Sequence, residues 1–478
     1  MFKKFRQSLI KSIVFIVFSF VSSSHASTES LVVSQRVLND KDINQLNLLK
    51  KEALSSILSY QIIESLTTEV GHRMMGSAGD ELAVKWAVDK MNRLGFDKVW
   101  TEEVTHTQWV RGEAQARIIA PYPQKIVVIA LGGSVGTGEK GITANVVHFN
   151  TLADLQAAEK DSLTGKIAFV SYRMARHIDG NGYGKAVGTR VNGASIAADK
   201  GALALIMRSV GTDDNRVAHT GVMSYKEGVN KIPAAALSNP DADLLVNQLN
   251  RGNPVSFYLK MTSSINQKTI IKSANVIGEI TGSELPDEIV AIGAHLDSWD
   301  VGTGALDDGM GVGMVLSAAH HISKLSVRPK RTIRVILFAA EEIGLLGAKQ
   351  YMIDHKDDIK NHVLGAEWDF GLGRIYQMKT GVGATALNAV REFAQLLAPL
   401  GVSLAPNNDA KAQSDMGLLS KAGMPSINFS PDGSRYFDYH HTENDTLDKV
   451  NLEDLQQNTA VYTMFAYFAA QTAVDFRK

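Results

Sequence analysis

An apolar strand pattern that leads directly into metal-binding residue types constrains this sequence more than any other stretch. Residues 288–293 read Glu-Ile-Val-Ala-Ile-Gly, a run with β-branched side chains that is typical of a strand buried within a parallel sheet. His295 and Asp297 follow at its carboxyl end and, being two residues apart, lie on one side of an extended chain. The histidine can therefore bind a metal ion while the carboxylate fixes the orientation of its ring.

A glycine-rich connection leads from this strand to Asp307 and Asp308. A helical pattern follows them, because apolar residues recur on one helix face at Val312, Val315, Leu316, Ala319 and Ile322. The connection thus brings a carboxylate to the same sheet edge as His295. A His-x-Asp tripeptide alone is more often a hydrogen-bonded loop pair than a metal site, so the assignment depends on the rest of the chain.

Two further buried strand patterns are followed by acidic residues. The pattern at 331–338 leads to Glu341 and Glu342, whose side chains point to different sides, so that one can bind metal while the other faces the substrate water. The pattern at 361–366 leads to Asp369. Acidic residues and histidine therefore appear at several strand ends, as expected at the carboxyl edge of an open α/β sheet.

The last loop of the chain adds two adjacent histidines. His440 and His441 lie in a polar loop, and a helical pattern runs from Leu447 to the end of the chain. Together the patterns predict an α/β fold in which a mixed, mostly parallel sheet lies between layers of helices.

Residues 122–262 differ from the flanking segments, because short strand patterns dominate and no group of acidic residues and histidines has metal-ligand spacing. We expect an inserted β-rich domain that covers a site rather than forming one. The main domain then comprises residues 27–121 and residues 263–478. Within the insertion we expect strands at 125–130, 166–170, 202–207 and 232–237, and a helix at 194–200. Loop residues outside the metal site are expected to include His72, His177, Asp179 and His219.

The first 26 residues are expected to be a cleaved signal peptide. Four basic residues precede an apolar stretch at 13–21, and Ser24-His25-Ala26 resembles a cleavage site. The apolar stretch is well short of the ~20 residues that a spanning helix needs, so we expect no membrane attachment after cleavage. Removal of the four basic residues would change the formal net charge from −1 to −5.

The overall composition favours an exported globular enzyme. With 49 Lys and Arg against 50 Asp and Glu, the chain lacks the positive charge of a nucleic-acid-binding protein. It contains no cysteine, which excludes disulfides and lipoprotein attachment. We expect a periplasmic or secreted protein, and a short propeptide after residue 26 is an open alternative.

Four motifs in this order resemble the co-catalytic zinc aminopeptidase and glutamate carboxypeptidase family. They are His295-Leu296-Asp297-Ser298-Trp299-Asp300-Val301-Gly302, Asp307-Asp308-Gly309, Ala340-Glu341-Glu342, and His440-His441 followed by Asp445-Thr446. The resemblance covers nearly the whole chain after the signal peptide. It implies a zinc exopeptidase fold, and it implies that residues 122–262 form a protease-associated domain.

The resemblance also implies two Zn²⁺ ions that share one carboxylate. It assigns His295, Asp307 and Asp369 to one ion, and Asp307, Glu342 and His441 to the other. Asp297 would orient His295, Glu341 would be the general base, and a hydroxide between the ions would be the nucleophile. His441 is preferred over His440 because the family pattern places the ligand histidine four residues before the aspartate of Asp445-Thr446. Such ligands could also hold Co²⁺ or Mn²⁺.

Two positions depart from the family pattern. Larger glutamate carboxypeptidases have a tyrosine directly before the ligand histidine, where it stabilises the developing oxyanion, and here that position is His440. We hypothesise that His440 takes that part. Trp368, next to Asp369, is bulkier than the small residue that is usual there, so the packing around this ligand is in question.

The resemblance implies an exported metallo-exopeptidase that hydrolyses dipeptides or short peptides, and it suggests a homodimer. The alternatives are an aminopeptidase on longer peptides and, from a different class, a binding protein that keeps the fold without catalysis. Relatives of the second kind lack metal ligands, whereas all five ligand positions and Glu341 are present here.

Overall fold

The strand predicted at 288–293 lies in the middle of an eight-stranded sheet in the computed structural model, which describes residues 36–478. The order is β1 (Lys98–Val110), β10 (Ser264–Ile280), β12 (Arg331–Phe338), β11 (Leu285–His295), β13 (His362–Glu367), β16 (Ser426–Pro431), β14 (Ile375–Gly381) and β15 (Ser403–Leu404). We call this the first sheet. β11 pairs in parallel with β12 and β13, and β13 pairs in parallel with β16. The carboxyl ends of these strands therefore share one edge.

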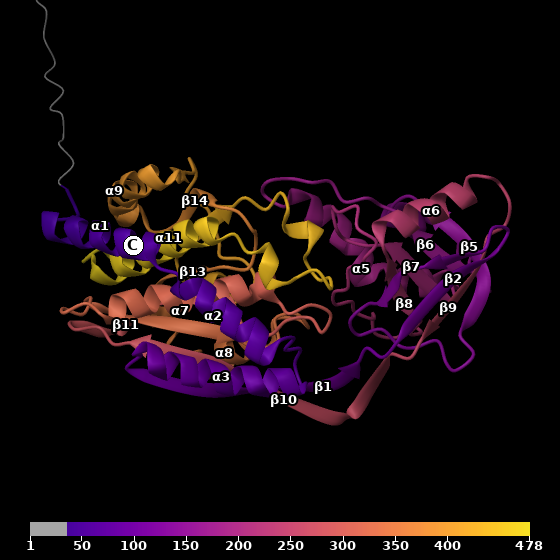
Figure 1. The fold of residues 1–478 in the computed structure, drawn as a ribbon, viewed down its shortest axis with the longest axis horizontal. Coiled ribbons are helices and arrows are strands. Elements are labelled where there is room, and N and C mark those ends of the chain that lie inside the picture. The colour runs from indigo at the N-terminus through magenta and orange to yellow at the C-terminus, as the bar shows by residue number, and fades with distance from the viewer. Residues whose placement is uncertain (1–35) are drawn as a thin grey trace, which may run out of the picture. The chain divides into compact units, whose positions relative to one another are not determined.

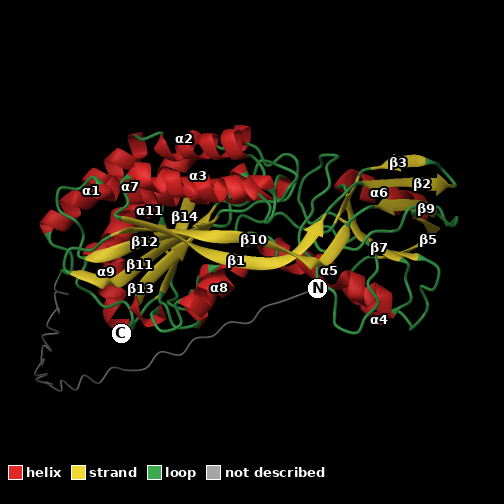
Figure 2. Cartoon of the chain, turned by 90° about the horizontal axis from the view of Figure 1, so that it is seen from below, coloured by secondary structure: helices red, strands yellow, loops and turns green. Residues whose placement is uncertain are grey.

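Helices cover both faces of the first sheet (Figure 1, Figure 2). One face packs against α3 (Ala78–Leu94), α7 (Met310–Ser323) and α11 (Leu452–Gln471), and the other against α8 (Leu346–Asp354) and α10 (Met416–Lys421). The helices α1 (Asp40–Ser55) and α2 (Leu58–Ser65) pack on α7 and α11. Alternate residues of β11 enter the two cores: Val290 and Ile292 belong to the first, and Ile289 and Ala291 to the second. Burial on both faces explains why this strand is a continuous apolar run. The predicted mixed α/β architecture is confirmed.

The C-terminal part differs in detail from the continuous helix predicted from Leu447. A short 3₁₀ turn, Leu447–Lys449, precedes α11, which ends at Gln471. Phe468 of α11 stacks on Phe393 of α9 (Leu387–Leu397), with the ring centroids 4.4 Å apart. The long helix thus joins α9 to the core of the first sheet.

A second sheet is built from strands that lie between β1 and β10 in the sequence. Its order is β3 (Gln124–Ile126), β2 (Ala114–Ala120), β9 (Ser256–Met261), β5 (Ile142–Phe149), β6 (Ile167–Val170), β7 (Ala204–Arg208), β8 (Ala234–Leu237) and β4 (Val128–Ala130). The same stretch carries α4 (Leu152–Ala157), α5 (Asn181–Asp199) and α6 (Asn239–Leu249). We call residues 114–261 the second-sheet region.

Two elements of the second-sheet region differ from their prediction. The single strand expected at 125–130 is two strands, because β3 pairs with β2 whereas β4 pairs with β8. The helix expected at 194–200 is the end of α5, which begins at Asn181. Its earlier turns contain Gly182, Gly184, Gly188 and Gly193, and glycine lowers helix propensity, so the sequence gives no clear helical pattern there.

The predicted signal peptide and the start of any propeptide lie outside the described residues. Between residues 36 and 478, no helix combines the length and the apolar character that crossing a membrane requires.

Candidate metal and catalytic site

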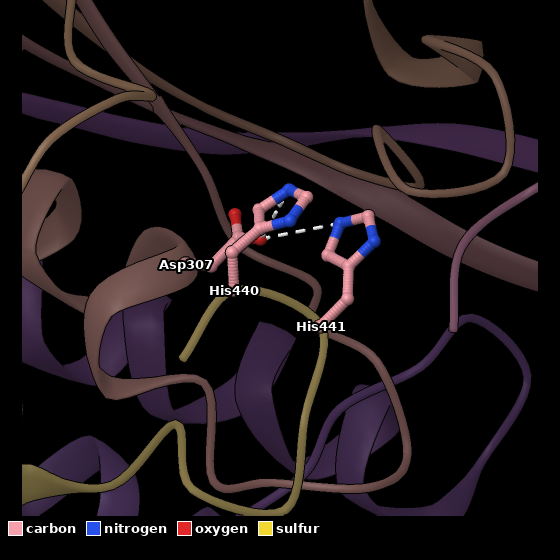
Figure 3. A group of neighbouring side chains, drawn as sticks. All are labelled: Asp307, His440 and His441. Atoms are coloured by element: carbon pink, nitrogen blue, oxygen red, sulfur yellow. Dashed lines mark ion pairs between the residues drawn. The ribbon is translucent and has the colours of Figure 1, made fainter. Parts of the chain in front are cut away.

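The carboxyl edge of the first sheet brings the five predicted metal ligands together. His295 is the last residue of β11, and Asp369 follows β13. Glu342 follows β12, and Asp307 lies in the segment Ala305–Gly309 that precedes α7, where its own backbone is extended and not helical. His441 comes from the loop after β16 (Figure 3). Residues that are far apart in sequence thus meet because their strands end at one edge.

Asp307 lies between two histidines. The Nε2 atom of His295 is 3.0 Å from Asp307 Oδ1 and 3.3 Å from Asp369 Oδ1. On the other side, the Nε2 atom of His441 is 3.3 Å from Asp307 Oδ2 and 3.0 Å from Glu342 Oε2. The two oxygens of one carboxylate therefore face two separate groups of potential ligands.

The donor atoms fit a metal centre. Within the described part of the chain, two groups of three ligand atoms lie within 4.8 Å of one another: His295, Asp307 and Asp369, and Asp307, His440 and His441. The buried atoms Asp307 Oδ2 and Glu342 Oε1 have no hydrogen-bond partner. Buried carboxylate oxygens without partners are costly, and a cation bound there would satisfy them. Imidazole and carboxylate ligands without thiolates suit zinc.

His440 lies next to two of the predicted ligands, Asp307 and His441. Its ring stacks on that of His441 with the centroids 3.5 Å apart, and its Nε2 atom is 3.6 Å from Asp307 Oδ2 (Figure 3). Burial and the adjacent His441 hold the pKa of His440 well below its usual range, which favours a neutral ring. The geometry is open to two roles, a metal ligand or a partner of the substrate.

Asp297 contacts the site in a way that the sequence did not predict. The ring nitrogen Nδ1 of His295 lies 3.0 Å from the backbone carbonyl oxygen of Asp297 and 3.6 Å from its carboxylate. The carboxylate instead accepts hydrogen bonds from the backbone N–H groups of Glu341, at 2.9 Å, and Glu342, at 3.2 Å. Asp297 therefore fixes both His295 and the Glu341–Glu342 turn.

The Glu341 carboxyl group is held next to the ligands. Ser414 donates a hydrogen bond from its Oγ to Glu341 Oε1 at 2.8 Å. Burial, together with the negative charge of Asp369, raises the pKa of Glu341 well above its usual range. A carboxyl group with a raised pKa is suited to accept a proton and release it again near neutral pH.

The second-sheet region contributes side chains to this site, so the expectation that it only covers the site is incomplete. A cavity of about 580 Å³ is lined by Glu341, His440, Tyr183 and Arg190, among others. Arg190 is buried, and its Nη2 donates to Tyr183 Oη at 2.6 Å. Its Nη1 atom lies 3.4 Å from His441 Nδ1, its Nε atom has no partner, and among the ion pairs of residues 36–478 none joins it to a carboxylate. The expected loop residue Asp179 also lines the cavity.

Arg73, like Arg190, supports the site although no sequence pattern predicted it. Its neighbour His72 is exposed, as expected of a loop residue, whereas Arg73 is fully buried. The Arg73 guanidinium donates to the carbonyl oxygens of Leu296 at 2.6 Å, Thr303 at 2.7 Å and Gly304 at 2.9 Å. It thereby holds the connection that carries Asp307.

Trp368 does not displace its neighbour Asp369. The Trp368 side chain is buried and meets Tyr462 of α11 edge to face, with the centroids 6.3 Å apart. Asp369 points the other way, toward His295. The bulky residue therefore fills the core while the ligand position remains open.

Comparisons with known proteins relate this chain to peptidases. Residues 275–466 match the profile of peptidase family M28. Carboxypeptidase Q of Mus musculus is 35% identical over 416 residues, which cover 86% of this chain and 85% of that protein. The aminopeptidase YwaD of Bacillus subtilis (strain 168) is 25% identical over 428 residues, covering 86% and 84%.

Solved structures give the same result. A peptidase M28 precursor from Shewanella amazonensis SB2B has a TM-score of 0.90 and 50% identity, covering 92% of this chain and 99% of that chain. BSAP, a zinc aminopeptidase from Bacillus subtilis, has a TM-score of 0.61 at 22% identity, covering 88% and 98%, and therefore shares the fold.

Proposed function

Because the chain belongs to peptidase family M28 and is a zinc metallopeptidase, we propose that it is an exported dinuclear zinc exopeptidase acting on dipeptides or short peptides. The position of Asp307 between two histidine and carboxylate groups carries this proposal. A carboxylate whose two oxygens face different groups is suited to share two cations.

In this proposal His295, Asp307 and Asp369 hold one zinc ion, and Asp307, Glu342 and His441 hold the other. When bound, zinc supplies Lewis acidity that lowers the pKa of water and polarises the scissile carbonyl group. Co²⁺ or Mn²⁺ could occupy the same ligands.

The remaining residues position groups and move a proton. Glu341 lies beside the ligands without being one of them, so we assign to it the transfer of a proton from water to the leaving amine. Ser414 and the Glu341 backbone contact with Asp297 fix its orientation. His440, which lines the cavity, is assigned to the developing negative charge on the carbonyl oxygen.

Arg190 favours a substrate with a free carboxylate. A buried guanidinium group without an acidic partner is costly, and in the cavity it faces the space that a peptide would occupy. Guanidinium groups bind carboxylates in a bidentate manner. We therefore assign Arg190 to the carboxylate terminus of a dipeptide, which favours a dipeptidase or carboxypeptidase over an aminopeptidase on longer peptides.

The experiment that tests this function combines zinc analysis with a dipeptide panel. The native protein should contain two zinc ions per chain, and Glu341→Gln should retain them while losing peptidase activity. Dipeptides with a free carboxylate should be hydrolysed, and Arg190→Met should raise their KM about 10–100-fold, the loss of a charged hydrogen bond. The KM of C-terminal amides should not change. Preference for long peptides with an amidated end would instead support the aminopeptidase, and an inactive native protein with zinc bound would support a binding protein.

Three broader assignments accompany this function. We propose that the second sheet and its helices form the protease-associated domain expected at residues 122–262, although β2, which precedes that range, also pairs within the second sheet. We propose cleavage after Ala26 and export, which N-terminal sequencing of the protein from the periplasm or medium would test. A homodimer is proposed from the resemblance alone, and the mass in solution by light scattering would test it.

A further inference from the structure

The loop that carries His440 and His441 is held largely by the second-sheet region. Thr212 donates a hydrogen bond from its backbone N–H to the Phe437 carbonyl oxygen at 3.0 Å. Its hydroxyl group donates to Asp438 at 2.8 Å, and Arg176 also binds Asp438, with its closest contact at 2.6 Å. The loop follows a strand of the first sheet, yet these contacts come from the other sheet.

His219 continues these contacts at His440. The Nδ1 atom of His219 lies 2.7 Å from the His440 carbonyl oxygen, and its Nε2 atom lies 2.8 Å from Asp213 Oδ1. A carbonyl oxygen only accepts, so Nδ1 is the donor in this contact. The ring is buried and fits closely, since a Cβ atom at Gly211 would come within 2.3 Å of it.

Thr220 provides the contact to the ligand itself. Its backbone N–H donates to the His441 carbonyl oxygen at 3.0 Å, and its own carbonyl oxygen lies 3.3 Å from His441 Nδ1. Arg190 Nη1, which can only donate, lies 3.4 Å from the same Nδ1 atom, slightly farther than the Thr220 carbonyl oxygen. When Nδ1 donates to the Thr220 carbonyl, the lone pair of Nε2 faces Asp307 and Glu342, as a metal ligand requires. The φ angle of His441 is 61°, a left-handed conformation that is unfavourable for a residue with a side chain and needs such support.

The other half of the centre needs no help from the second sheet. The ring of His295 is held by the carbonyl oxygen of Asp297, two residues further along the same chain segment. Asp369 likewise follows a strand of the first sheet. The two histidines are therefore oriented by different parts of the molecule.

We propose that His219 and Thr220 are positioning residues for His441, so that the second-sheet region completes one half of the metal centre. This inference rests on the proposed dinuclear function. Loss of the His219 contact should loosen the loop and weaken the zinc ion held by His441, while the ion held by His295 is retained.

Two substitutions at His219 separate positioning from simple packing. The amide nitrogen of His219→Asn can take the place of Nδ1 and still donate to the His440 carbonyl, whereas that of His219→Gln lies nearer to Nε2. The zinc affinity of each purified protein is measured by competition with a chromogenic chelator, and both binding steps are compared with the native values. His219→Gln should lower one of the two affinities about 10-fold and leave the other unchanged. This is the lower end of the effect of removing a direct outer partner of a metal ligand, because His219 acts on the backbone beside His441. His219→Asn should restore most of the lost affinity.

A matched control is available at His355, whose Nε2 atom lies 2.8 Å from Glu102 and which does not line the cavity. His355→Gln should leave the zinc affinity unchanged. Native affinity in His219→Gln, or an equal loss in the control, would overturn the inference. If His219→Gln does not fold, Asp213→Asn, which weakens the support of the same ring, should lower the affinity in the same direction, and an unchanged value would reject the inference.

Failure of the proposed function gives a different result. A native protein that holds a single zinc ion would reject the dinuclear assignment whatever the variants do. With a single ion, loss of zinc in His441→Ala would identify it as the ion held by His441, and His219→Gln should then lower its affinity; an unchanged affinity would reject the inference.

Discussion

At the scale of single residues, the His440 ring can serve in either of two roles at the site. Its Nε2 atom lies 3.6 Å from Asp307, and its Nδ1 atom is buried without a hydrogen-bond partner. A neutral imidazole ring can donate a hydrogen bond to an oxyanion or bind a metal, and these two roles lead to different effects of substitution.

We expect His440→Ala to lower kcat about 100-fold and to leave the zinc content unchanged, because removal of one donor to an oxyanion typically has an effect of this size. Steady-state kinetics together with elemental analysis would check this. Loss of zinc would show that His440 is a ligand, and unchanged turnover would remove it from the mechanism.

The residues of the site that belong to local motifs could be predicted from the sequence. His295, Asp307, Glu342, Asp369 and His441 follow strand patterns or stand in short acidic and histidine runs, and the structure brings them together. Residues such as Arg73, Arg190 and His219 bind carbonyl oxygens or side chains more than two hundred residues away, or stand alone in a glycine-rich helix. Such contacts leave no pattern in the sequence near the residue.

At the scale of elements, two buried side chains, Arg73 and Asp445, hold the connection between β11 and α7. Arg73 joins the end of β11 to the glycine-rich connection through three carbonyl oxygens, and the Asp445 carboxylate accepts the backbone N–H groups of Leu306, at 2.7 Å, and Asp307, at 3.2 Å. The position of Asp307 is therefore fixed by backbone contacts on both of its sides.

Arg73→Met should lower the free energy of unfolding by about 3–5 kcal/mol, because several buried carbonyl oxygens lose charged donors. Arg73→Lys should be nearly as destabilising, since a single ammonium group cannot replace the planar fork of a guanidinium group. Urea unfolding of the metal-free proteins would measure both changes. A loss below about 1 kcal/mol for Arg73→Met would show that the connection holds its shape without this residue.

Strand predictions succeeded where both faces of a strand are buried. β12 has the predicted limits, 331–338, and all eight of its residues are buried. α5 was mostly missed, since its packing in the second-sheet region, and not helix propensity, maintains a helix with four glycines. Propensity and periodicity act locally, whereas such packing depends on segments that are distant in sequence.

At the scale of the whole molecule, the described residues form one compact unit in which the site lies at the junction of the two sheets. Arg111, just after β1, crosses this junction. Its guanidinium group binds Asp300, in the connection between β11 and α7, with the closest contact at 2.6 Å. It also donates to the Thr220 hydroxyl group of the second-sheet region at 2.7 Å. The sequence around Arg111 gives no indication of these contacts, because Asp300 and Thr220 are distant from it along the chain.

The stability of the whole protein should fall on mild acidification. Burial, assisted by the positive charge of Arg334, lowers the pKa of His362 to about 3, and its Nε2 atom faces Tyr351 Oη at 2.8 Å. The unfolded chain takes up a proton near pH 6.5 while the folded chain does not, so stability is lost as the pH falls from about 6.5 toward 3. At about pH 5 the loss is about 2 kcal/mol.

His362→Gln keeps an acceptor for Tyr351 and removes this titration. The difference in unfolding free energy between about pH 7 and pH 5, measured with urea, should therefore shrink by about 2 kcal/mol in the variant. An equal pH dependence in both proteins would mean that other groups govern the acid response.

The pairing of β1 with β10 has a consequence for how this enzyme could change over time. These strands pair from Lys98 to Val110, so a short hairpin turn could join them and complete the first sheet without residues 114–261. A shortened enzyme of that kind would keep its scaffold but would have to acquire, in the same event, a new partner for the imidazole of His441. If the second-sheet region orients His441 as proposed, relatives that lose this region should carry a compensating change near His441.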